Sequence, residues 1–306
     1  LVAFVRATQP QVADALDLDG DSVTRHKFLA RLQGEITKDG VVSVLRHGVQ
    51  HLAHHVAFFF PTPTPGNPRA ASLFALNRFS VTRQVRYSRS SPNLAVDLVA
   101  FVNGLPVATF ELKNNITKQT VEEAVAQYQR DRDPRELLFG FGRCMAHFAV
   151  DDQRVNFCTA LKGKASWFLP FDQGFNDGAG NPPNPHGLMT DYLWRKVLSP
   201  ASLANLIENY AQIVTTKNTK TGSKTIQQIF PRFHQLDVVR KLLADVERHG
   251  AGRRYLVQHS AGSGKSNSIA WLAHQITSVR HRGEPAFDSV IVVTDRVILD
   301  SQLKET

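Results

Sequence analysis

The sequence predicts a mixed α/β protein in two parts, joined by a short polar segment. Three observations lead to this prediction. Alternating apolar and polar residues, typical of strands, begin at residues 79–87 and return several times up to residue 160. Helix-like patterns lie before and between these stretches. Further along, a glycine-rich loop stands between an apolar stretch and an apolar helical run.

The composition is that of a globular protein with a positive charge. The chain has 306 residues, 42% of them hydrophobic, which is enough for one large or two ordinary domains. Lysine and arginine number 36 against 27 acidic residues, so the net charge is +9. A field of this sign favours polyanionic partners such as nucleic acid, although charge alone does not establish one.

The two cysteines and the lack of long apolar runs bear on the compartment. Cys144 and Cys158 stand among apolar residues, so we expect reduced core thiols and neither a disulfide framework nor a zinc site. No apolar run approaches the roughly twenty residues that span a bilayer, and the N-terminus lacks a signal-peptide pattern. We therefore expect a cytoplasmic protein.

The elements of the first part follow in order. We expect helices over residues 26–32 and 45–55, whereas the prolines between 58 and 67 stop any helix. The expected strands cover residues 79–87, a hairpin within 96–113, and residues 144–150 and 155–160. Residues 170–187 hold too much Gly and Pro for regular structure and predict a long loop.

The polar, basic segment of residues 215–224 has nothing to bury, so we place the domain boundary there. The predicted organisation is a domain over residues 1–212, a linker over 213–225 and a second domain over 226–306.

Three charged residues interrupt the two apolar strands of the expected hairpin: Asp97, Glu111 and Lys113. Burying an unpaired charge in a sheet costs several kcal/mol, so such groups either reach water or hold something. In an antiparallel hairpin, Asp97 faces Glu111 only if paired residue numbers sum to 208, which needs an odd-numbered connection or a bulge. A two-residue turn at Asn103-Gly104 alone would place them on opposite faces.

Two carboxylates and one ammonium group on one face suit a Mg²⁺ ion, which takes one or two carboxylates, waters and phosphate oxygens. Such an ion lowers the pKa of a bound water and offsets charge that builds on a phosphodiester, while Lys113 would orient the attacking water or the phosphate. The alternative is an edge strand that carries charges for solubility.

A helix is expected directly after the hairpin. Thr120 and Glu123 form a capping box, and the helix runs over residues 121–130 before Pro134. It would bring Gln127 back over the hairpin. The alternative for Gln127 is a place on a solvated polar face.

These residues together resemble a known family, the PD-(D/E)xK nuclease domain of type I restriction enzyme motor subunits. The resemblance rests on the stretches at 77–84, 103–106, 111–114 (Glu-Leu-Lys-Asn), 127–134, 168–171 and 178–182, and on Asp97. It implies a nuclease core with a mixed sheet flanked by helices, in which Asp97 and Glu111 are metal ligands and Lys113 is the catalytic lysine. Gln127 is the helix residue that many relatives place beside the site. The Gln-x-x-x-Tyr spacing of many such nucleases would need a tyrosine at position 131, where this chain has Asp131.

A phosphate-binding loop is expected in the second part. An expected buried strand at residues 253–258 precedes His-Ser-Ala-Gly-Ser-Gly-Lys-Ser at 259–266, and an apolar helical run follows at 269–276. Strand, loop and helix in this order form the context in which backbone N–H groups of Gly262, Ser263 and Gly264 surround phosphates. Lys265 should reach the β- and γ-phosphates of ATP and Ser266 the accompanying Mg²⁺. The alternative is a purely structural glycine turn.

Two flanking stretches resemble superfamily 2 helicases and imply part of a RecA-like lobe. Residues 232–236 are similar to the adenine-reading element, with Gln235 in that role, and residues 289–296 are similar to the following strand motif. No Asp-Glu dipeptide occurs, so the box that would activate water for ATP hydrolysis is missing. We therefore expect an N-terminal piece of a larger motor that binds ATP without turning it over.

The function predicted from the sequence is a Mg²⁺-dependent endonuclease domain joined to the start of an ATP-binding translocase. The resemblance implies double-stranded DNA as substrate, and methyltransferase (M) and specificity (S) subunits as partners. The rivals are a P-loop ATPase whose N-terminal domain only binds DNA, and a scaffold without activity that docks methyltransferase subunits.

Overall fold

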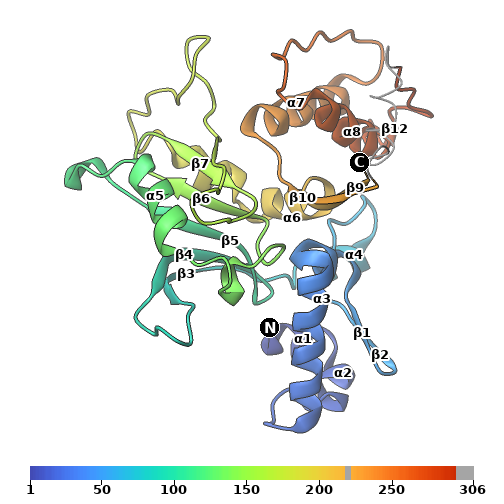
Figure 1. The fold of residues 1–306 in the computed structure, drawn as a ribbon. Helices are drawn as coiled ribbons and strands as arrows, with labels where there is room; N and C mark the ends of the chain where they lie inside the picture. Colours follow the sequence, from blue (N-terminus) through green and yellow to red (C-terminus); the bar gives the residue numbers. More distant parts are fainter. Residues whose placement is uncertain (218–221, 294–306) are drawn as a thin grey trace. The chain divides into compact units, whose positions relative to one another are not determined.

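The computed structural model describes residues 1–217 and 222–293, and the chain divides into two compact units (Figure 1). The first unit consists of residues 1–213 and 228–230. The second consists of the described residues of 214–227 and from 231 onward. The predicted mixed α/β class is confirmed, because a six-stranded mixed sheet flanked by helices forms the body of the first unit.

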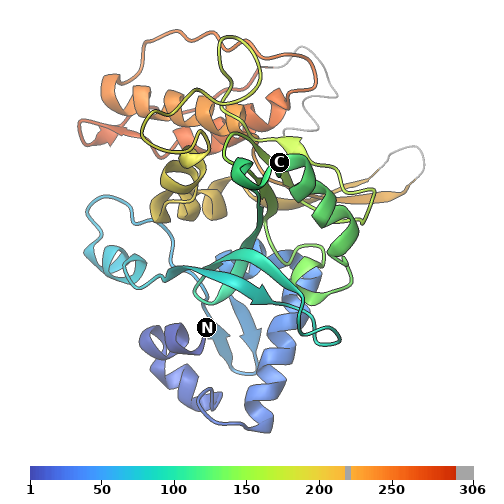
Figure 2. The same ribbon diagram turned by 90° about the vertical axis from the view of Figure 1, so that its left-hand side faces the viewer.

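Three helices open the first unit, drawn in blue in Figure 2: α1 (Val2–Thr8), α2 (Pro10–Ala15) and α3 (Val23–His47). The helix expected over residues 26–32 is confirmed within α3. Ser22 caps it by accepting a hydrogen bond from the Arg25 amide at 3.2 Å. Gly40, at φ 82°, interrupts the helical backbone.

The helix expected over residues 45–55 is wrong beyond His47. Gly48 takes φ 69°, which ends α3, and a short antiparallel hairpin follows, β1 (Val49–His51) and β2 (His54–Val56). Val49 and Val56 pair across this hairpin and are both buried. Burial of these two side chains therefore outweighs the helical pattern.

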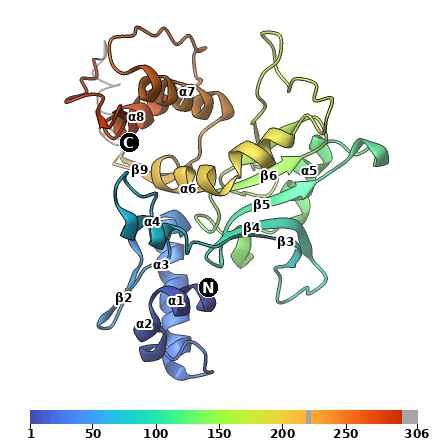
Figure 3. The same cartoon turned by 180° about the vertical axis from the view of Figure 1, so that it is seen from behind.

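The central sheet has the strand order β3-β4-β5-β6-β7-β8, and Figure 3 labels β3 to β6. Only β5 and β6 run parallel, and all other neighbours are antiparallel. The strands are β3 (Phe79–Arg86), β4 (Ala95–Val102), β5 (Leu105–Leu112), β6 (Ala146–Val150), β7 (Val155–Cys158) and β8 (Leu169–Pro170). All strands predicted for this part are confirmed. No helix forms between residues 58 and 67, as expected, and α4 (Pro68–Phe74) begins directly after Asn67.

Helix α5 (Val121–Asp131) crosses over between the parallel strands β5 and β6. Its predicted capping box is confirmed, with the Glu123 carboxylate accepting from the Thr120 amide at 2.5 Å. The carboxylate of Asp151, at the end of β6, accepts from the Val121 amide at 2.8 Å. Both contacts satisfy amides that have no partner inside the helix, and they fix the N-terminus of α5 over the sheet.

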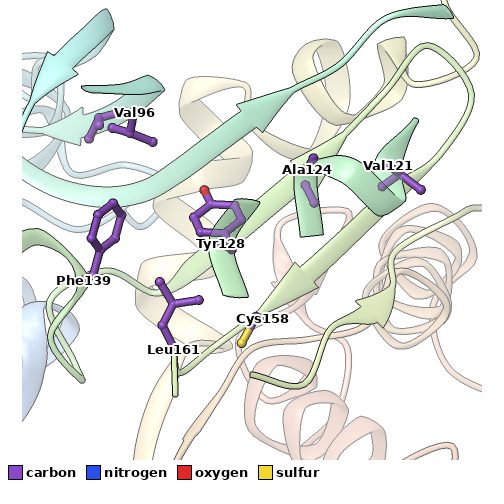
Figure 4. Close-up of a cluster of buried hydrophobic side chains, with 9 residues drawn as sticks. Val96, Val121, Ala124, Tyr128, Phe139, Cys158 and Leu161 are labelled. Atoms are coloured by element: carbon purple, nitrogen blue, oxygen red, sulfur yellow. The ribbon is translucent and has the colours of Figure 1, made fainter. Parts of the chain in front are cut away.

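One hydrophobic cluster joins α5 to the sheet (Figure 4). Its buried members are Val96, Val99, Val121, Ala124, Tyr128, Phe139, Ala149, Cys158 and Leu161. Tyr128 and Phe139 meet edge to face, with ring centroids 6.4 Å apart. Because α5 contributes three members, its position over β5 is set by packing as well as by its caps.

The remaining elements of the first unit complete it. They are η1 (Asn115–Thr117), η2 (Leu137–Phe139), η3 (Leu193–Val197) and α6 (Pro200–Asn209). The predicted loop at 170–187 is confirmed, since it holds no helix or strand beyond Pro170. Buried Asn181 holds it down, donating to the Gln153 carbonyl at 2.8 Å and accepting from the Gln173 amide at 2.8 Å. Cys144 and Cys158 are free and buried, as expected.

The predicted linker carries two strands, β9 (Gln212–Lys217) and β10 (Lys224–Ile229), which pair with each other. The second unit contains α7 (Phe233–His249), α8 (Lys265–Ile276) and a small ladder of β11 (Arg280–His281) with β12 (Glu284–Pro285).

The buried strand predicted at residues 253–258 is wrong: this segment is irregular and exposed, with Leu256 at 94% exposure. A parallel strand forms only against neighbouring strands, and none pairs with it among the described residues. Residues 289–293 likewise form no strand, and the rest of that prediction, 294–296, lies outside the described residues. Within the described ranges, no helix is long and apolar enough to cross a membrane.

Candidate functional site

The hairpin of β4 and β5 brings Asp97 and Glu111 to the same face of the sheet. Next to the turn, Val102 pairs with Leu105, so paired numbers sum to 207. The register then shifts, and from Ala100 onward the pairs sum to 208, as in Leu98 with Phe110. A two-residue turn and one bulge, with Val107 as the extra residue, therefore produce the register that the convergence of the two carboxylates needs.

The buried side-chain amide of Asn103 fixes the turn between β4 and β5. Asn103 and Gly104 both have positive φ, 52° and 84°, which a tight two-residue hairpin requires. The Asn103 side chain donates to the Phe58 carbonyl and to Asn77 Oδ1, and accepts from the Arg78 amide at 2.6 Å. These contacts hold the end of the hairpin and thereby the register of both strands.

Both oxygens of Asp97 have donors. Oδ2 accepts from the Leu112 amide at 2.8 Å, and Oδ1 accepts from Gln84 Nε2 at 3.1 Å. Gln84 lies in β3 with φ 50°, a backbone conformation that non-glycine residues adopt at a cost. A strained residue beside a carboxylate is a frequent feature of functional sites.

Glu111 is fully buried and bonded to an arginine. Its Oε1 accepts from Arg132 Nε at 2.5 Å, while Oε2 is buried and accepts no hydrogen bond among the described residues. Burial raises the pKa of Glu111 from 4.5 to about 7; Arg132 opposes this rise and the carboxylate of Asp97 adds to it.

Lys113 stands just beyond the end of β5 and contacts α5. Its Nζ donates to Gln127 Oε1 at 2.6 Å, and both side chains are half-buried. The four residues expected from the sequence at this site, Asp97, Glu111, Lys113 and Gln127, thus lie around one end of β5. Gln127 does not lie on a purely solvated face.

A buried polar network lies beneath these residues. Thr109 Oγ1 bonds both Tyr128 OH at 2.8 Å and His147 Nδ1 at 2.7 Å. Burial lowers the pKa of His147 to about 3, so its ring is neutral at physiological pH. Because Thr109 is two residues before Glu111 and Tyr128 follows Gln127, the network fixes the helix and the strand that carry the site.

Sequence reasoning missed Arg132 and Gln84. Arg132 follows α5 immediately, but its partner Glu111 is 21 residues away, so no local pattern marks it. Gln84 lies opposite Asp97 because β3 and β4 pair with residue numbers that sum to 181, a register that only the structure shows.

The carboxylate oxygens of Asp97 and Glu111 are the type of donor that a magnesium ion binds. No group of three or more His, Cys, Asp and Glu side chains that could hold a metal occurs among the described residues. Asp97 and Glu111 supply two hard oxygen donors, however, and Mg²⁺ commonly takes no more than two carboxylates and completes its shell with waters and phosphate. The unpaired Oε2 of Glu111 is such a donor.

The second unit has a glycine loop at the N-terminus of α8. Gly262 and Gly264 take positive φ, 74° and 78°, and Gly264 caps the helix. Lys265 Nζ donates to the carbonyls of His259 and Ser260 at 3.1 and 3.0 Å, so the loop curls around the lysine. Ser266 follows as the second residue of α8 and Ser263 is buried within the loop.

Gln235 lies against this loop. Its Nε2 donates to the carbonyls of Ser263 and Gly264 at 3.1 and 2.8 Å, and its Oε1 accepts from the Arg232 amide at 2.8 Å. A Cβ at position 264 would lie 2.3 Å from Gln235 Nε2. Gln235 therefore supports the loop in this conformation, with both amide hydrogens engaged.

Comparisons with known proteins match both units. Residues 35–166 match the family model of the type I restriction enzyme R protein N terminus, and residues 234–306 match that of the SWI2/SNF2 ATPase. The first unit therefore resembles the N-terminal part of type I restriction enzyme R proteins. The R protein N-terminal match includes β3 to β7 and every residue of the carboxylate site.

Curated relatives carry names of the same family. The HindI endonuclease subunit of a type I restriction enzyme from Haemophilus influenzae is 25% identical over 236 residues. A Methanocaldococcus jannaschii protein with the provisional name type I restriction enzyme MjaVIIIP endonuclease subunit is 23% identical over 240 residues. Each alignment covers 75% of this chain but 21% of the relative. The chain thus spans about a fifth of the length of these relatives.

Proposed function

We propose that the first unit is a Mg²⁺-dependent DNA endonuclease domain, and that the second unit binds ATP as part of a DNA translocase. The observation that carries the nuclease proposal is the meeting of Asp97 and Glu111 on one face of the hairpin, with Lys113 beside them and Glu111 Oε2 unpaired. The names of the endonuclease-subunit relatives support it.

Each residue has a definable task in this proposal. Asp97 and Glu111 would hold the metal ion through one oxygen each. Bound there, Mg²⁺ supplies a water of lowered pKa and positive charge against the phosphodiester. Lys113 would donate hydrogen bonds to the scissile phosphate or the attacking water, and Gln127 would hold Lys113 in place through the 2.6 Å bond.

The substrate proposed is double-stranded DNA, bound without sequence preference by this chain. The net charge of +9 favours a phosphate backbone, whose contacts make binding steeply salt-dependent. The methyltransferase and specificity subunits of type I restriction enzymes are the proposed partners, and they would supply sequence recognition.

ATP is the proposed ligand of the glycine loop. Its backbone amides, Lys265 and Ser266 would meet the phosphates and their magnesium ion. The Lys265 contacts to His259 and Ser260 would then exchange for phosphate oxygens. An adenine contact by Gln235 would require at least one of its two loop bonds to open.

The proposal is tested by Mn²⁺ binding and by nicking of supercoiled plasmid in Mg²⁺, with EDTA as the control. We expect the 306-residue chain to bind Mn²⁺, and Glu111→Gln to bind none and to nick nothing. Equal Mn²⁺ binding by wild type and Glu111→Gln would overturn it.

The strongest rival is a first unit that only binds DNA, in which the Arg132–Glu111 ion pair is structural. The 2.5 Å contact favours this rival, because it partners Glu111 without a metal. The unpaired Oε2 argues against it, since a purely structural pair would satisfy both oxygens. The metal-binding measurement separates the two.

A further inference from the structure

The side chain of Arg132 is buried next to Glu111 and held by three hydrogen bonds. Arg132 follows α5, and its side chain is only 5% exposed. Its Nε donates to Glu111 Oε1 at 2.5 Å, its Nη2 to the Ala95 carbonyl at 2.9 Å, and its Nη1 to Tyr87 OH at 3.2 Å. The guanidinium carbon also lies 5.5 Å from the centre of the Tyr87 ring. Three directed bonds fix the plane of the guanidinium.

This contact decides how Glu111 is presented. Arg132 binds Oε1 of the Glu111 carboxylate, and Oε2 is the oxygen that has no hydrogen bond among the described residues. Asp97 is fixed as firmly, by the Leu112 amide and Gln84. The two carboxylates therefore face each other in one orientation before any ligand arrives.

The ion pair between Arg132 and Glu111 is not explained by stability alone. A buried pair of charges loses much of its hydration, and replacing such pairs by apolar residues is often neutral or stabilising. The unpaired Oε2 adds a further cost, because a buried oxygen without a hydrogen bond has lost its hydration. A buried carboxylate oxygen without a hydrogen bond destabilises the fold, but it is free to bind a ligand.

We infer that Arg132 is a positioning residue of the metal site: its guanidinium fork holds Oε1 of Glu111 so that Oε2 alone is offered to the divalent ion. This inference rests on the proposed nuclease function. Arg132 touches neither the metal nor the substrate, and acts through Glu111. A positive charge without the fork does not suffice, since a lysine cannot make the three directed contacts at once.

The test uses the whole chain and Mn²⁺ alone as the probe, with affinity measured by calorimetry in the absence of DNA. Arg132→Lys and Arg132→Met should both weaken Mn²⁺ binding by about 10–100-fold, the usual loss when a residue that orients a metal ligand is removed. Tyr87→Phe, which deletes one of the three contacts, should give a smaller loss. Arg135→Met is the matched control, because Arg135 is 91% exposed and pairs with Asp133 outside the site.

The possible results separate this inference from the proposed function. Wild-type binding together with unchanged affinity in Arg132→Lys overturns the inference and leaves the metal site standing. Absence of Mn²⁺ binding by the wild type overturns both. If Arg132→Met does not fold by circular dichroism, Tyr87→Phe decides: a weakened affinity at unchanged melting temperature supports positioning, and an unchanged affinity contradicts it.

Discussion

The carboxylates of Asp97 and Glu111 face each other because β5 carries one residue, Val107, more than β4 can pair. Without this bulge the two-residue turn would send them to opposite faces of the sheet. One of them would then point away from α5, Lys113 and Gln127. A single irregularity in the hairpin thus decides whether the two carboxylates lie on the same face.

Removal of either carboxylate should abolish metal binding without unfolding the chain. We expect Asp97→Asn to lower Mn²⁺ affinity below detection in calorimetry, because one remaining carboxylate is too weak a ligand set. Asp133→Asn is the control, since Asp133 pairs only with exposed Arg135. Retained affinity in Asp97→Asn would show that the ion binds elsewhere.

Metal binding should weaken as the pH falls through about 7. The pKa of Glu111 is raised to about 7 by burial, and a metal ligand must lose its proton first. Below pH 7 the affinity should therefore fall by up to tenfold per pH unit, and a flat calorimetric profile between pH 5.5 and about 7.5 would contradict this expectation.

The same raised pKa should affect stability in the metal-free chain. Between about pH 4.5 and 7 the folded state keeps a proton on Glu111 that the unfolded state releases. The contribution of this group to the free energy of unfolding therefore decreases as the pH rises through that window. Urea unfolding of wild type and Glu111→Gln at several pH values measures this contribution. The free energy of unfolding of the wild type should fall relative to that of Glu111→Gln as the pH rises.

Lys113 should matter for cleavage and not for metal binding. Lys113→Ala is expected to abolish plasmid nicking while Mn²⁺ affinity stays within a few-fold of wild type, because the ammonium group acts on the phosphate or the water. Gln127→Ala, which frees Lys113 from its 2.6 Å bond, should give a partial loss of rate. Lys118→Ala, at an exposed position, is the control. Full activity in Lys113→Ala would remove this lysine from the mechanism.

Thr109 should contribute to stability through its two buried partners. Thr109→Val keeps the shape but leaves Tyr128 OH and His147 Nδ1 without their bond to Oγ1. We expect the free energy of unfolding to fall by about 1–3 kcal/mol in urea titrations. Thr82→Val, on the exposed strand β3, should change it little.

Nucleotide binding should depend on Lys265 and not on Lys113. Lys265→Ala should remove binding of a fluorescent ATP analogue and leave Mn²⁺ binding at the carboxylate site of the Lys265→Ala chain unchanged. Lys241→Ala is the control, since Lys241 is exposed and pairs with Asp237. ATP binding that survives Lys265→Ala would contradict the proposal for the glycine loop.

The second unit shows where local pattern fails. The segment 253–258 suggests a buried strand because it contains the apolar run of residues 255–257, yet it is exposed and irregular. Strand formation depends on neighbours that supply hydrogen-bond partners, and local composition carries no information about them. The glycine loop and α8 depend on local backbone freedom and periodicity, and both appear where the sequence predicts them.

The sequence by itself determined strands β3 to β7 of the central sheet, the capping box of α5 and the four candidate residues near the end of β5, because periodicity, caps and charge in apolar runs are local properties. It left open whether Asp97 and Glu111 share a face. Only the tertiary structure decided that, through the bulge at Val107. It also decided that Arg132 holds Glu111, because that contact joins residues 21 positions apart that only packing of α5 on the sheet brings together.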